Sequence, residues 1–168
     1  MKLRLLAAFA AFALVLLLPL ASAQAECTDP AAPEVNWRRC YMDNRDLRGV
    51  NLAGAMLRDA TFQRTDLTGA NLSEVDGYRA KFVSTDVSEA DFEGARLIEA
   101  DFTRARADAA SFADADLRNA KLVNASLRGA DFTGARVAGT DFRHADLSGA
   151  TWIDGKRVCA DSSVGQCN

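Results

Sequence analysis

The sequence has little of what most enzyme chemistry requires. It contains a single histidine, His144, and no G-x-S-x-G, HExxH, phosphate-loop or dinucleotide-binding motif. No nucleophile motif adjoins His144, and its carboxylates recur with a repeat instead of forming isolated pairs. We therefore predict that the chain is not an enzyme and binds no cofactor.

Long apolar runs are absent after the first 25 residues. Residues 5–18 form one uncharged apolar stretch, preceded by Lys2 and Arg4 and followed by small residues at Ala23 and Ala25. This pattern is typical of a signal peptide cleaved after Ala23 or Ala25, and the stretch is short for a membrane span. We therefore expect a periplasmic or secreted protein with no membrane span after cleavage, a retained N-terminal anchor being the alternative.

An excess of positive charge is also absent. The formal net charge of the full chain is −3, and removal of the two positive charges of Lys2 and Arg4 takes it to −5. Proteins that bind nucleic acid usually carry a basic surface that neutralises phosphates. The charge balance therefore predicts no nucleic-acid partner.

Cysteine is absent between residues 41 and 158. Cys27 and Cys40 precede this segment, and Cys159 and Cys167 follow it. In an exported protein such cysteines are expected to form disulfides, and four cysteines allow three pairings. We favour the two local pairs because the long central segment keeps its ends apart, and each closed loop contributes about 3 kcal/mol. The spacings do not match a zinc ribbon, so we expect no metal.

What the sequence does have is a period of five. From Leu47 to Trp152 every fifth residue is apolar or small, in 22 consecutive pentapeptides. This central residue is Leu or Phe in 17 units, and the residue two before it is Ala in 16. A strand has a period of two and a helix a period of 3.6, so neither element can run through this segment.

The period also predicts a turn in each unit, because a side chain that recurs every five residues points inward only if the backbone bends at that interval. Glycine recurs accordingly: eight of the eleven glycines lie two residues after a central residue. Glycine is favoured where a tight turn requires a positive φ. The chain should therefore wind into a coil whose turns pair through backbone hydrogen bonds, as in a solenoid.

These residues resemble the pentapeptide-repeat family, whose motif is A-(D/N)-(L/F)-x-x. Residues 70–74 (Ala-Asn-Leu-Ser-Glu) and 145–149 (Ala-Asp-Leu-Ser-Gly) fit the motif well, and the resemblance covers 110 of the 168 residues. It implies an all-β fold, a right-handed quadrilateral β-helix with four pentapeptides per coil and about 5.5 coils of 20 residues. The segment after Trp152, with Cys159 and Cys167, also resembles exported members with cysteine-bearing caps.

A step of 20 residues sorts the sequence in a way that agrees with this implication. At that step phenylalanines fall into common columns, and charges of opposite sign alternate along others, as in Asp76, Arg96, Asp116 and Arg136. Gly77 is a weak core position, and we interpret it as a local bulge.

The organisation expected from these patterns has four parts. Residues 1–25 are the signal peptide, residues 26–44 an N-terminal cap with Cys27 and Cys40, residues 45–154 the β-helix, and residues 155–168 a C-terminal cap with Cys159 and Cys167. Trp37 and Met42 keep the five-residue register, so the N-terminal segment either begins the helix or caps it.

Charge differs between the faces of the predicted coil. We call residues 50–54 and their equivalents at steps of 20 the acidic face, and residues 60–64 and their equivalents the basic face. The basic face has a net charge of +3 and the other two faces −2 and +1. The acidic face has a net charge of −6 and no Lys or Arg; its carboxylates are Glu74, Asp91, Glu93, Asp114, Asp131 and Asp154.

Three interpretations of the acidic face are open. It could dock a cationic protein partner, bind Ca²⁺ through oxygen ligands recurring from Asn51 to Thr151, or be a solvated face that keeps an exported protein soluble. The sequence does not specify an oligomeric state.

We predict an exported, non-enzymatic scaffold or protein-binding module. The alternative is a DNA-mimic inhibitor of DNA gyrase, the best-known activity in the family that the motif resembles. The signal peptide and the mixed charge columns, with 14 basic against 18 acidic residues in the repeats, argue against it.

Overall fold

The computed structural model describes residues 27–168. The predicted signal peptide, residues 1–25, lies outside the described residues. Within residues 27–168 the secondary structure consists of isolated β-bridges and turns, with no helix and no longer strand. None of this described part therefore forms a helix that could cross a membrane.

Each pentapeptide has the same local structure. The residue before the centre forms a β-bridge, and the two residues after the centre form a turn. The turn is closed by a backbone hydrogen bond, as from the Ala55 N–H to the Leu52 carbonyl at 2.9 Å. The residue two after the centre has a positive φ at all 24 positions from Glu34 to Gly149, as a type II turn requires. This is the bend that the glycine positions predict.

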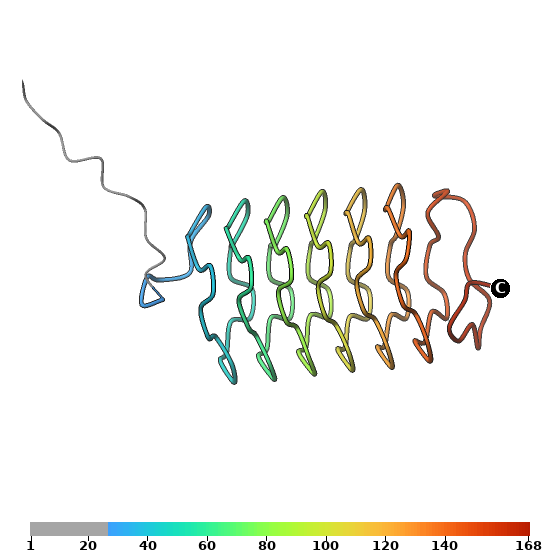
Figure 1. Ribbon diagram of the computed structural model, residues 1–168. Coiled ribbons are helices and arrows are strands. Elements are labelled where there is room, and N and C mark those ends of the chain that lie inside the picture. Colours follow the sequence, from blue (N-terminus) through green and yellow to red (C-terminus); the bar gives the residue numbers. More distant parts are fainter. Residues whose placement is uncertain (1–26) are drawn as a thin grey trace, which may run out of the picture.

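The bends wind the chain into one continuous coil (Figure 1). Twenty parallel bridges, from Asn36↔Met56 to Asp131↔Thr151, all join residues 20 apart in the sequence. One turn of the coil therefore contains four pentapeptides, and each residue stacks on the residue 20 positions later. The central residue of most units and the Ala two before it are buried inside the coil.

Aromatic side chains fill the interior in columns. Consecutive rings stack with centroids 4.7 to 5.2 Å apart, in the series Phe62, Phe82, Phe102 and in the series Phe92, Phe112, Phe132. Rings of the two columns meet edge to face, as for Phe92 and Phe102 at 5.7 Å. Stacked and edge-to-face pairs add to the free energy of burial. The predicted columns are therefore present.

The predicted bulge at Gly77 is wrong. The Gly77 N–H donates to the Arg96 carbonyl at 2.9 Å, and Asp76 keeps its bridge to Arg96, so the register is unbroken. A Cβ at Gly77 would lie 2.9 Å from a methyl group of Leu97. The missing side chain is therefore compensated by Leu97 of the next coil, which packs against the bare backbone.

The coil begins earlier than the predicted boundary at residue 45. Asn36 and Tyr41 already pair with the next coil, and Trp37 and Met42 are buried in central positions. The preceding cap is short and is joined to this first coil by the disulfide Cys27–Cys40. The boundary was set too late because the first pentapeptides lack the usual Ala and Leu, although burial depends only on an apolar side chain in register.

The C-terminal segment closes half of the last coil. Val158 and Val164 form antiparallel bridges with Thr151 and Asp146, and the disulfide Cys159–Cys167 holds this segment together. Both disulfides are thus the local pairs favoured from the sequence. The segment covers residues 145–152 and leaves residues 135–144 as a bare edge, since no backbone carbonyl of the described residues accepts the N–H of Val137 or Phe142.

Candidate functional site

The six predicted carboxylates lie on one side of the coil. The bridges Asn71↔Asp91, Asp91↔Ser111, Ser111↔Asp131 and Asp131↔Thr151 stack the acidic face along the coil axis. The face also includes Glu34, which the sequence boundaries left out and whose side chain lies beside Gly54 of the next coil. The five-residue register through Trp37 was the signal that could have found it.

The centre of the acidic face is a shallow hollow of about 300 Å³. Its lining residues are Ser73, Glu74, Asp91, Glu93, Gly94 and Asp114. The structure thus brings four of the six predicted carboxylates together around one surface depression, whereas Asp131 and Asp154 lie outside it.

Glycine separates the carboxylates of the hollow along the coil axis. The column that runs from Glu34 alternates acid and glycine: Glu34, Gly54, Glu74, Gly94, Asp114, Gly134 and Asp154. The Glu74 side chain lies 3.7 Å from the position that a Gly94 Cβ would take. Like charges on adjacent coils would be about 4.8 Å apart and would repel, so the glycines double the spacing.

Three of the predicted carboxylates stabilise the backbone locally. Asp91 accepts the N–H of Glu93 at 2.9 Å, and Asp131 accepts the N–H of Thr133 at 2.8 Å. This contact recurs in many pentapeptides and explains why the motif has Asp or Asn before the central residue, because such side chains cap turns.

Asp154 has the same kind of role at the C-terminal end. Hydrogen bonds from the backbone N–H groups of Arg157 and Lys156 lower the pKa of its carboxyl group.

The other three carboxylates have no such role. Glu74, Glu93 and Asp114 make no side-chain hydrogen bond or ion pair within the described part of the chain. All three are exposed. They are therefore the groups of the acidic face that are available to a partner.

Ion pairs are distributed unevenly around the coil. Ten are present within the described residues, nine of them on the two faces between the acidic and basic faces. Examples are Arg79–Glu99 at 2.8 Å and Arg96–Asp76 at 3.2 Å. The tenth, Arg143–Asp141, lies on the basic face. The acidic face has none in this part, so its charge is not neutralised within the molecule.

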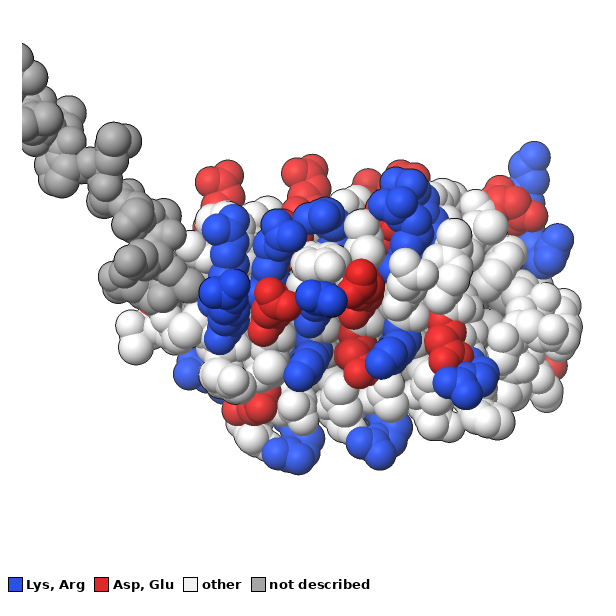
Figure 2. Space-filling model, viewed as in Figure 1, with Lys and Arg blue, Asp and Glu red and all other residues white. Residues whose placement is uncertain are grey.

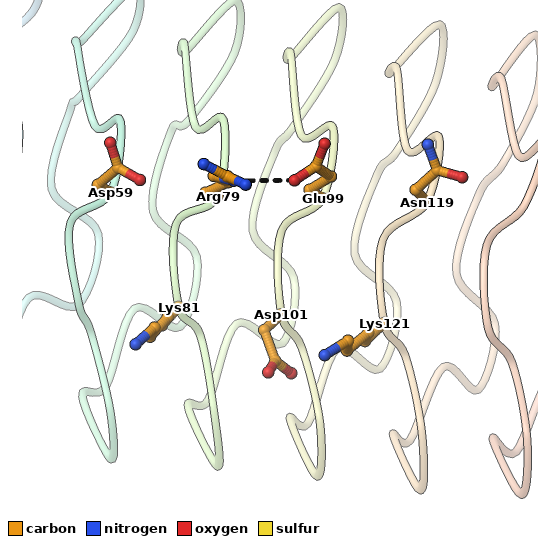
Figure 3. A pocket seen from close by; sticks show the side chains of 7 residues that line it. All are labelled: Asp59, Arg79, Lys81, Glu99, Asp101, Asn119 and Lys121. Carbon is orange, nitrogen blue, oxygen red and sulfur yellow. Dashed lines mark hydrogen bonds and ion pairs between the residues drawn. The ribbon is translucent and has the colours of Figure 1, made fainter.

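The opposite side of the coil carries lysines and arginines without ion-pair partners among residues 27–168. They are Arg64, Lys81, Arg104 and Lys121. Lys81 and Lys121 lie on either side of Asp101 in a hollow of about 450 Å³, which also contains the Arg79–Glu99 pair (Figure 3). Figure 2 shows blue side chains over the viewed face, with red side chains along its upper edge.

Arginines also surround one tyrosine beside this hollow. The guanidinium groups of Arg58, Arg79 and Arg96 lie 5.1, 5.2 and 5.5 Å from the centre of the Tyr78 ring. A cation over an aromatic face is attracted by the ring electrons. The cluster therefore holds three arginines in place on a face where Asp76 and Glu99 also pair with them.

Neither a metal site nor a catalytic group is visible in the described residues. No group of three or more His, Cys, Asp or Glu residues in this part could hold a metal ion. His144 is exposed at a turn position with φ 60°. The oxygen column considered for Ca²⁺ is engaged in turns, since Asn51 and Asn71 accept backbone N–H groups as Asp91 and Asp131 do.

The repeat itself identifies the family. The family model described as "Pentapeptide repeats" matches eight copies, over residues 34–76, 78–112 and 110–149. The chain is a pentapeptide-repeat protein. This family is a repeat family, and no catalytic family is indicated for the chain.

Comparison with curated proteins found no match for this pentapeptide-repeat protein. Among solved structures, Rfr23 from the cyanobacterium Cyanothece 51142 is 24% identical, with 70% of this chain and 90% of that chain covered and a TM-score of 0.46. A pentapeptide repeat protein from the Arabidopsis thaliana thylakoid lumen is 23% identical, with 77% and 84% covered and a TM-score of 0.33.

The third comparison is with QnrB1, described as a plasmid-mediated fluoroquinolone resistance protein. It is 18% identical, with 71% of this chain and 73% of that chain covered and a TM-score of 0.48. At these identities and TM-scores the likenesses carry no conclusion about what this pentapeptide-repeat protein does.

Proposed function

We propose that this protein is an exported, non-enzymatic scaffold or protein-binding module that docks a cationic protein through its acidic face. One observation carries the proposal: the ion pairs that neutralise two faces are missing from the acidic face within the described residues. Glu74, Glu93 and Asp114 are exposed there without side-chain partners. A surface with charge of one sign attracts a partner of the opposite sign.

We propose the periplasm or the extracellular space as its location. The two disulfides support this, because disulfides persist mainly in oxidising compartments. The apolar N-terminal stretch of residues 5–18 supports it independently.

The finer architecture that we propose is a right-handed quadrilateral β-helix of about 5.5 coils. The 20-residue step of the parallel bridges and the four turns per step support it. Such a shape presents flat, separate faces, as docking of a partner on one face requires.

The docking proposal is tested by charge reversal on the acidic face. The variant E74K/D114K changes two carboxylates that make no side-chain bond in the described structure. After crosslinking in the native envelope, we expect mass spectrometry to find that partners of the wild-type protein are lost from this variant.

The matched control is E89K/D161K, which changes the net charge equally at two exposed residues outside the acidic face. It should keep the crosslinks. Equal retention of all partners by E74K/D114K would refute docking through the acidic face.

The DNA-mimic alternative is separable by a gyrase-inhibition assay on the mature protein. DNA presents continuous negative charge, whereas Arg96 and Arg136 here interrupt a column by pairing with Asp76 and Asp116, each at 3.2 Å. We expect no inhibition, and strong inhibition would overturn the proposal.

A further inference from the structure

We propose that the cationic partner of the acidic face is the basic face of a second copy of this protein, so that copies associate side by side with parallel axes. This inference rests on the proposed function, which makes the acidic face a docking surface. It follows from where unpaired charges lie, how they are spaced and how the two faces would meet.

The two faces lie on opposite sides of the molecule. One turn of the coil takes 20 residues, so residues 10 apart in the sequence are half a turn apart. The acidic face begins at residues 50, 70 and 90, and the basic face at residues 60, 80 and 100. A sideways displacement of one copy, without rotation, therefore brings its basic face against the acidic face of its neighbour.

Both faces repeat their unpaired charges at every second coil. On the acidic face Glu74 and Asp114 are 40 residues apart, with Gly94 between them. On the basic face Lys81 and Lys121 are also 40 residues apart. The spacing is common to both faces, about 10 Å for two coils, because one coil generates both.

The edges of the two faces match in the displaced arrangement. The chain runs in opposite directions across opposite faces, so the residue after the turn of one face meets the residue before the centre of the other. Glu74 then faces Lys81, and Asp114 faces Lys121, each pair separated by seven residues in the sequence.

The other edge carries a second set with its own constant offset. Asp91 faces Arg104, and Asp131 faces His144, each pair separated by 13 residues. An offset of seven or 13 residues corresponds to a height difference of about 2 or 3 Å along the axis, which long side chains can span. The match is therefore made at several points at once.

The remaining two faces favour no such contact, because they neutralise themselves. Arg58, Arg79, Arg96, Arg118 and Arg136 on one of them all have carboxylate partners in the same molecule. Association through the acidic and basic faces is heterologous and does not close, so it produces rows of copies instead of a symmetric dimer.

The first test is sedimentation velocity of the mature, disulfide-bonded chain over a range of concentrations. At low ionic strength we expect the weight-average sedimentation coefficient to rise with concentration. At about 0.5 M NaCl we expect the monomer, because salt screens exposed charges over distances beyond a few Å.

The second test uses charge reversal on each face. E74K/D114K and K81E/K121E should each lower the association constant by about tenfold or more. Mixing the two variants should restore association, because the reversed face of each is complementary to the reversed face of the other. The control E89K/D161K, with the same charge change as E74K/D114K, should associate like the wild type.

Folding of each variant is checked by its thermal melt. K81E/K121E places carboxylates beside Asp101, so K81Q/K121Q serves as a second variant and should weaken association without that repulsion.

A wild-type protein that stays monomeric at low salt, variants that associate like the wild type, or a mixture that does not recover would each overturn the inference. Association through the bare edge at residues 135–144 would appear as insensitivity to these substitutions. If self-association fails while E74K/D114K still loses a different crosslinked protein, the proposed function stands and only the identity of the partner is wrong.

Discussion

At the scale of the residue, each pentapeptide depends on one position with a left-handed backbone. Sixteen of the 24 such positions from Glu34 to Gly149 are not glycine. A non-glycine residue there costs about 1 kcal/mol or more, because Cβ approaches the backbone. The fold therefore tolerates repeated local strain, which the hydrogen bonds and burial of each coil offset.

Replacement of Ala109 by glycine should stabilise the protein by up to about 1 kcal/mol. Ala109 has φ 56° and is exposed, so glycine relieves strain and removes little packing. The free energy of unfolding in denaturant measures the effect. Ala113→Gly is the control, since residue 113 lacks a positive φ and the change there should destabilise. A destabilising A109G would contradict this account of the turn.

Acid should remove part of the stability through Asp86. Burial raises the pKa of its carboxyl group, but hydrogen bonds from Arg106 and Ser88 outweigh burial and lower it to about 2. A carboxyl group with a lowered pKa in the folded state stabilises above its unfolded pKa, near 4, and loses that contribution as the pH falls towards 2.

In Asp86→Asn this pH-dependent share, about 1 to 2 kcal/mol, should be missing between pH 4 and pH 2. Urea unfolding across that range checks it. Asp161→Asn, an exposed residue in the C-terminal segment, should leave the acid profile unchanged. The interpretation fails if D86N and the wild type lose stability in parallel below pH 4.

At the scale of the element, the coil is a stack of turns whose two ends need separate treatment. The N-terminal cap and the C-terminal segment are each closed by a disulfide. The C-terminal segment pairs with residues 145–152 only, through bonds such as that from the Gly149 N–H to the Cys159 carbonyl at 2.9 Å. The last coil is therefore half covered and half open.

Amide exchange should report this division within one coil. The N–H groups of Leu147 and Gly149 donate to the C-terminal segment, whereas those of Val137 and Phe142 have no acceptor in the described structure. We expect the first two to exchange slowly and the second two rapidly, since an amide without a hydrogen bond needs no opening step. Equal protection of all four, measured by NMR, would show that something covers residues 135–144.

At the scale of the whole molecule, the protein is a one-dimensional array in which each coil contacts only its neighbours. Position along the axis should therefore determine the cost of a core substitution. Phe102 is fully buried and contacts the rings of Phe82, Phe92 and Phe112, whereas Phe142 at the C-terminal end is only partly buried.

Phe102→Ala should cost about 3 to 5 kcal/mol, and Phe142→Ala clearly less. The first leaves a cavity between two coils, and the second leaves a space that water can reach. Denaturant unfolding at neutral pH compares them. Equal losses would mean that the end of the coil is packed as tightly as its middle.

The charge asymmetry also belongs to this scale. Nine ion pairs neutralise two faces and leave unpaired carboxylates and unpaired cations on opposite sides. No single pentapeptide shows this, because each contributes to one face only.

Much of this protein was predictable from its sequence, because a period of five leaves little choice to the backbone. Alanine and Leu or Phe in register predict which side chains are buried, and the glycines predict the turn. The step of 20 gave the phenylalanine columns and the membership of the acidic face. Prediction was weakest where the motif is weak, at Gly77, whose gap is filled by Leu97, and at Trp37, where the coil begins.

The tertiary structure alone decided which charges remain available. An ion pair depends on side chains that lie on adjacent coils, 18 or 20 residues apart, or two residues apart within a turn. The same composition therefore yields a neutralised face where Arg79 meets Glu99, and an unneutralised one where Glu74 meets Gly94. Spacing along the chain determines the coil, whereas contact between coils determines the surface that a partner meets.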